Sequence, residues 1–218
     1  YINEFKGVLF REFGIRSNIY EHYWEYEQYV RLAIPAIAAL KTIGAAERDK
    51  PTVIVAHEFM GMPTALAGIL DPFDFKTVFY AHEVAPMRSI VEGHPGHDTM
   101  FYNVMRKAAQ NDLYVNDIFG DQSHNFKYAL VEAARHCDNV LAVGDCVVEE
   151  LQFLSPEFKI ADIALTYNGI PAYPISLAER YQSRNRLRQY CENLLGWKPD
   201  FVFTHVTRLV LSKGLWRD

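Results

Sequence analysis

The chain has little of what several classes of protein need. Its 218 residues include only three cysteines, Cys137, Cys146 and Cys191, and no CxxC spacing. Neither a disulfide framework nor a structural zinc site is therefore expected. Cysteines this sparse are expected to be unpaired and to pack as small buried hydrophobic residues. Unpaired cysteines are typical of a reducing compartment, so the sequence predicts a cytoplasmic protein.

An excess of basic residues is also missing. The chain has 22 Lys+Arg against 27 Asp+Glu and a formal net charge of -5, so no nucleic-acid partner is expected. No apolar run reaches the roughly 18 residues that predict a membrane span. Hydrophobic residues make up 50% of the chain, which excludes disorder as its main state. Its length fits one large domain, or one domain and part of another.

Three familiar motifs are absent. GxGxxG does not occur, which disfavours a nicotinamide enzyme, and neither do GxxxxGK[ST] and GxSxG. A zinc-protease helix needs a second histidine four residues after the first, and Gly61 and Pro86 occupy those positions after His57 and His82. An alternative interpretation is a metal-dependent hydrolase that uses four histidines as metal ligands: His57, His82, His94 and His97.

Strand and helix patterns alternate along the chain. Residues 52–56 form a β-branched run without alternating polarity, which predicts a strand buried on both faces. Further strands are predicted at residues 76–81, 139–143, 163–166 and 201–206. Helices are predicted at residues 61–70, 126–137, 145–154 and 176–195, after an aromatic helical stripe within residues 19–40. This order predicts an α/β fold, a Rossmann-like open parallel sheet with helices on both faces.

Polar residues follow each predicted strand. The pairs are His57-Glu58, His82-Glu83, Gly144-Asp145, Asn168-Gly169 and Thr207-Arg208. Ligands of open α/β sheets bind beyond the carboxyl ends of the strands, so these residues predict a site at that edge. Lys213 follows Arg208 by five residues, and two cations at such an edge suit a diphosphate.

The order of these segments resembles the amino-terminal part of GT-B retaining glycosyltransferases, close to glycogen synthases and related group 1 glycosyltransferases. Residues 55–61 resemble their His-Glu-Trp strand end, with Phe in place of Trp, and residues 77–83 resemble their Thr-Thr-His strand end. Residues 101–103 and 133–140 are similar to an insertion and helix of the eukaryotic-type glycogen synthases. Residues 167–170 resemble Pro-Asn-Gly-Ile, with Tyr in place of Pro, and residues 207–214 resemble Ser-Arg-Leu followed by Lys-Gly.

The resemblance implies a fragment of a retaining hexosyltransferase. Such an enzyme moves a sugar, here glucose, from a nucleotide sugar such as UDP-glucose or ADP-glucose to a glucan or a small sugar acceptor. It needs no metal or other cofactor. The resemblance implies catalytic roles for His82, which would face the donor sugar, and for Arg208 and Lys213, which would bind its diphosphate. It implies substrate-binding roles at the cleft wall for five further residues: His57, Glu58, Glu83, Asn168 and Gly169.

The same resemblance implies a division of the chain. Residues 1–198 would form the Rossmann-like acceptor-side domain, and residues 199–218 the first strand and loop of a truncated nucleotide-sugar-binding domain. A glycine-rich loop would precede Tyr1 and paired glutamates would follow Asp218, so the isolated chain is expected to be inactive. The alternative is a non-catalytic α/β sugar-binding or regulatory module. The aromatic helix around residues 20–29 is a candidate interface for a homo-oligomer.

Overall fold

A computed structural model describes residues 1–46, 51–93, 97–209, 213 and 215. The chain divides into two compact units, Tyr1–Tyr167 and Asn168–Asp218. The sequence-based division at residues 198/199 falls inside the second of these units. The prediction that a second domain begins at residue 199 stays a prediction.

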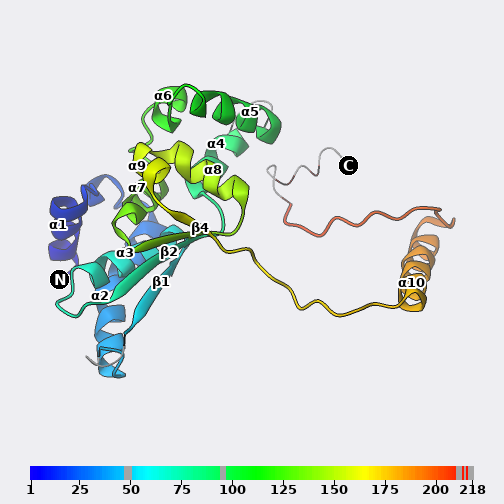
Figure 1. The fold of residues 1–218 in the computed structure, drawn as a ribbon, viewed down its shortest axis with the longest axis horizontal. Helices are drawn as coiled ribbons and strands as arrows, with labels where there is room; N and C mark the ends of the chain where they lie inside the picture. The colour runs from blue at the N-terminus through cyan, green and yellow to red at the C-terminus, as the bar shows by residue number, and fades with distance from the viewer. Residues whose placement is uncertain (47–50, 94–96, 210–212, 214, 216–218) are drawn as a thin grey trace. The chain divides into compact units, whose positions relative to one another are not determined.

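The first unit is an α/β structure built on a four-stranded parallel sheet (Figure 1). The strands are β1 (Val53–His57), β2 (Lys76–Ala81), β3 (Asn139–Ala142) and β4 (Ile163–Leu165). They lie side by side in chain order, β1-β2-β3-β4. The predicted α/β class and parallel sheet are confirmed.

Helices precede and connect these strands. Before β1 come α1 (Ile2–Phe13), the 3-10 turn η1 (Ser17–Ile19) and α2 (Trp24–Thr42). Helix α3 (Glu58–Ile69) connects β1 to β2. Between β2 and β3 lie α4 (Ala85–Gly93), α5 (His97–Ala109), α6 (Val115–Phe119), α7 (Phe126–Glu132) and η2 (Ala133–His136). Helices α8 (Asp145–Leu154) and α9 (Pro156–Ile160) connect β3 to β4.

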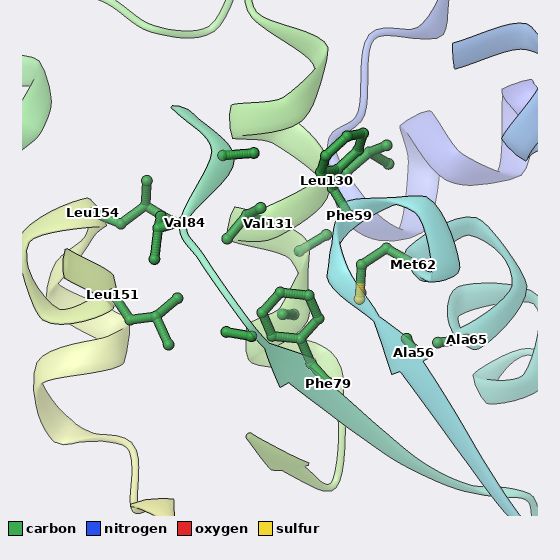
Figure 2. Close-up of a cluster of buried hydrophobic side chains, with 14 of the residues drawn as sticks. Ala56, Phe59, Met62, Ala65, Phe79, Val84, Leu130, Val131, Leu151 and Leu154 are labelled. Atoms are coloured by element: carbon green, nitrogen blue, oxygen red, sulfur yellow. The ribbon is translucent and has the colours of Figure 1, made fainter. Parts of the chain in front are cut away.

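The core lies on one face of the sheet. Figure 2 shows Phe79 of β2 and Ala56 of β1 with side chains from α3, α7 and α8, among them Met62, Val131 and Leu151. All five are buried. The alternating direction of side chains along a strand places every second residue of β1 and β2 on this face.

The opposite face of the sheet, here called the open face, is not covered by any helix among the described residues of the first unit. Val53 and Val55 of β1 are 51% and 45% exposed there. The predictions that the 52–56 run is buried on both faces and that helices cover both faces are therefore wrong for this unit. Each strand is followed along the chain by its neighbour on the same side of the sheet, in the order β1-β2-β3-β4. Because crossover connections between parallel strands are right-handed, the helices of these connections all lie on the same face of the sheet. Helices on both faces require a reversal of strand order.

The aromatic residues around position 20–29 mostly serve the core. Tyr20 and Tyr26 are buried, and Ser17 Oγ is 2.7 Å from the Tyr26 hydroxyl oxygen. Trp24 is 75% exposed. All three cysteines are free: Cys146 is exposed, and burial raises the pKa of the Cys137 thiol to about 11.

The second unit contains α10 (Leu177–Leu195). A capping box begins this helix, since Ser176 Oγ accepts from the Glu179 N–H and the Glu179 carboxylate accepts from the Ser176 N–H. Gly196, with φ of 77°, ends it in the left-handed conformation that favours glycine. The predicted strand at residues 201–206 does not form: Phe203 and Val206 are 93% and 96% exposed.

Candidate functional site

The carboxyl ends of β1 and β2 bring two histidines together. His57 is the last residue of β1, and His82 directly follows β2. His57 Nδ1 lies 3.0 Å from His82 Nε2, and the rings are stacked with centroids 5.3 Å apart. In this contact one nitrogen donates a proton and the other accepts it. The sequence predicted both residues at this edge, and the structure shows that they form a hydrogen-bonded pair.

Tyr80 adds a third ring to the pair. Its centroid lies 4.5 Å from that of His82 and 5.4 Å from that of His57. Tyr80 is the register partner of His57 and lies two residues before His82, so all three side chains leave the sheet on the open face. The Tyr80 hydroxyl donates to the Thr166 carbonyl oxygen at 2.8 Å. We call His57, Tyr80 and His82 the edge cluster.

The sequence analysis did not select Tyr80, although a signal was present. Alternation along a strand places residues 80 and 82 on the same face, so identifying His82 as a site residue should have drawn attention to Tyr80.

The two glutamates beside these histidines differ in their surroundings. The Glu58 side chain is buried, 8% exposed, and its Oε1 accepts from the N–H groups of His82 and Glu83 at 2.5 and 2.8 Å. Burial raises the pKa of Glu58 to about 7, against the opposing effect of these two hydrogen bonds. Glu83 is half-buried. The substrate-binding roles predicted for both stay predictions, and the contacts of Glu58 are to the protein's own backbone.

A second polar pair lies along the same edge, where β3 and β4 end. The Tyr167 hydroxyl donates to Asp145 Oδ2 at 2.8 Å, and this hydrogen bond raises the pKa of Tyr167. Asp145 is the first residue of α8, directly after Gly144, the N-cap of that helix. Both side chains are exposed and therefore accessible to a ligand.

Four predicted site residues belong to the second unit: Asn168, Gly169, Arg208 and Lys213. Each of them is exposed. Because residues 201–206 form no strand, Arg208 does not stand at a strand end, and the sequence-based argument for its position fails. The diphosphate-binding role of Arg208 and Lys213 stays a prediction that rests on the resemblance alone.

The metal-dependent hydrolase has no support from the described residues. Within them, no three His, Cys, Asp or Glu side chains are grouped as a metal ion would require. His57 and His82 contact each other. His94 lies outside the described residues, as does the side chain of His97.

A separate cavity of about 340 Å³ lies between α5, α8 and α9. Buried Met105 and Phe153 are among its lining residues, and an ion pair between Arg106 and Glu149 lies at its wall, with Nε 3.0 Å from Oε2. None of the predicted site residues lines this cavity.

The chemistry of the edge cluster suits a ligand rich in hydroxyl groups. The His57–His82 hydrogen bond uses one nitrogen of each imidazole and leaves the other, one as a donor and one as an acceptor. The Tyr80 hydroxyl donates to Thr166, and its oxygen can still accept, so the remaining groups match the hydroxyls of a neutral ligand. The ring faces add apolar surface, which suits the C–H faces of a sugar ring. None of the three residues of the edge cluster is a lysine or an arginine, so the cluster itself offers no permanent cation to neutralise a phosphate.

No protein-family model matches the chain, and no curated protein matches it significantly. In the described part of the chain, no helix combines the length and the apolar character needed to cross a bilayer.

Proposed function

We propose that the chain is the acceptor-side part of a GT-B retaining glycosyltransferase that uses a nucleotide-sugar donor. One observation carries the proposal. Two neighbouring parallel strands end in His-Glu pairs, and their histidines meet with Tyr80 at the edge where α/β sheets bind ligands. These two strand ends are among the segments whose residues resemble the glycosyltransferase motifs.

In the proposed reaction, the groups of the chain have separate tasks. The edge cluster binds sugar hydroxyls, and His82 contacts the donor sugar. Arg208 and Lys213 bind the donor diphosphate and offset the negative charge that develops on it as the glycosidic bond to the sugar breaks. The sugar is glucose, and the acceptor is a glucan or a small sugar.

The test measures the release of nucleoside diphosphate from nucleotide sugars by the natural, full-length protein. A panel of nucleotide sugars is assayed with and without a glucan acceptor. Acceptor-dependent release from one donor is expected. His82→Ala, Arg208→Ala and Lys213→Ala should each lower turnover about a hundredfold, as for loss of a charge-stabilising or positioned polar group. His22→Ala removes a histidine whose ring contacts Tyr23 and which is not part of the edge cluster, and it serves as the matched control.

A second candidate is a sugar-binding module without catalysis, because the edge cluster offers hydrogen-bonding groups and a ring platform without any cation. Titration calorimetry with a maltooligosaccharide separates the two. Binding that is lost in His82→Ala, without release from any donor, favours the module. If the folded protein neither binds sugar nor releases nucleotide, both candidates are wrong.

A further inference from the structure

The turn between β1 and α3 is unusually tight. The strand ends at His57, and the helix begins at Glu58 without a loop. Glu58 has φ of +58°, a left-handed conformation that costs a non-glycine residue about 1 kcal/mol or more. Gly61 permits this arrangement, since a Cβ there would lie 2.8 Å from Ala56 Cα. The surrounding packing therefore holds Glu58 in a conformation it would not adopt alone.

This conformation accompanies an inward direction of the Glu58 side chain. The last register pair of the β1–β2 ladder is His57 with Tyr80, so the backbone of residues 82 and 83 lies beyond the ladder. There Glu58 Oε1 accepts from both the His82 and the Glu83 N–H. The carboxylate thus joins the two strand ends where backbone pairing stops.

The same contact sets the geometry of the two imidazoles. His57 directly precedes Glu58, and His82 provides one of the two N–H donors. Each histidine backbone is therefore tied to the same carboxylate. Their ring nitrogens lie 3.0 Å apart with the ring planes 19° from parallel, an arrangement that a shift of either strand end would disrupt.

We propose that Glu58 is the positioning residue of the edge cluster: its buried carboxylate holds the His57–His82 pair in register and does not itself contact the ligand. The proposal deepens the proposed function and rests on it for the identity of the ligand, a sugar. It does not rest on it for the geometry of the pair, which can be measured in the chain alone.

A further observation is consistent with an internal role. Within the described structure Glu58 Oε2 is buried and has no hydrogen-bond partner, so this oxygen is shielded from solvent as well as from a ligand at the open face. A residue that bound substrate directly would need an accessible oxygen.

The first experiment measures amide exchange and imidazole N–H signals by NMR. In Glu58→Ala, exchange of the His82 and Glu83 amides should rise about tenfold or more relative to the Phe79 amide, as expected when a hydrogen bond to a buried carboxylate is lost. The imidazole N–H signal of the hydrogen-bonded His57–His82 pair should also disappear. Glu58→Gln, which keeps an acceptor oxygen, should retain that signal and most of the amide protection.

Two further variants control for stability and folding. Val140→Ala removes buried volume from the core face of β3, opposite the face that carries the edge cluster, and should lower stability without losing the imidazole signal. If Glu58→Ala does not fold, the same signals are measured in Glu58→Asp, which keeps the charge but shortens the side chain by one methylene. Unchanged amide protection and an unchanged imidazole signal in the folded variant would overturn the proposal.

The second experiment links the geometry to the ligand. In the protein as the cell makes it, Glu58→Ala should lower turnover, and Glu58→Ala combined with His82→Ala should lower it little further than His82→Ala alone. Glu58→Gln should restore turnover to within a few-fold of the unaltered protein. If the imidazole signal depends on Glu58 but the unaltered protein transfers no sugar, the positioning role stands and the proposed function fails.

Discussion

The difference in unfolding free energy between Glu58→Gln and the unaltered protein should grow in favour of the variant as the pH rises. Burial raises the pKa of Glu58 to about 7 from an ordinary value of 4.5. The folded state therefore favours the neutral carboxyl, and the stability associated with this group is fully present below pH 4.5. It is lost as the pH rises toward and through 7. The complete loss is about 3 kcal/mol, since each pKa unit corresponds to about 1.4 kcal/mol.

Glutamine cannot ionise, so Glu58→Gln removes this loss. Its amide places an N–H₂ group where Oε2 lies without a partner, which costs about 1–3 kcal/mol at every pH and gives a constant offset. The slope therefore tests the reasoning and the absolute difference does not. Two charged neighbours modify the pKa of Glu58 in opposite directions: Glu83 raises it and Arg88 lowers it.

The assay is urea unfolding of both proteins at half-unit steps between pH 4 and pH 8. The difference in unfolding free energy, variant minus unaltered, should grow by about 3 kcal/mol over this range, or about 1 M in the urea midpoint. Glu4→Gln removes a carboxylate that is 86% exposed and controls for the change in net charge. A difference that stays constant with pH, or that falls as the pH rises, would refute the burial argument.

Three further substitutions test the packing. Gly61→Ala places a Cβ 2.8 Å from Ala56 Cα and should destabilise the first unit by about 1–3 kcal/mol, seen as a lower Tm; an unchanged Tm would contradict the close approach. Glu150→Ala leaves Arg88 without its fully buried partner and should cost about 3–5 kcal/mol in urea unfolding, whereas a cost under 1 kcal/mol would show that the pair is not buried in solution. Ser176→Ala removes the cap of α10 at a cost of about 1 kcal/mol, which faster amide exchange in the first turn of α10 would reveal and unaltered exchange would dispute.

The four strands and several of the helices could be predicted because their signals are local. The structure has β2 at Lys76–Ala81 and α8 at Asp145–Leu154, with the predicted bounds. In β2 the apolar run ends at a polar pair, and in α8 an acidic residue opens the helix and the apolar periodicity continues to Leu154. The helix predicted at residues 126–137 divides into α7 and a 3-10 turn, a change within the last turns that residue pattern does not distinguish.

The predicted strand at residues 201–206 shows the limit of a local signal. Phe203 and Val206 have the residue types of a buried strand, yet both are exposed in the second unit. A strand needs a partner for its N–H and C=O groups, and residue pattern does not say whether a partner exists. The prediction of a strand-end position for Arg208 failed with it.

The sequence by itself determined the α/β class, the positions of the four strands and the presence of His-Glu pairs at two strand ends, because each depends on the residues of one segment. Only the tertiary structure decided that β1 lies beside β2, so that His57 and His82 meet across 25 positions of sequence. It also decided that Glu58 points inward, since the packing of α3 against β1 imposes its positive φ. The open face has the same origin: strand order and the direction of the connections belong to the whole sheet, and no single segment encodes them.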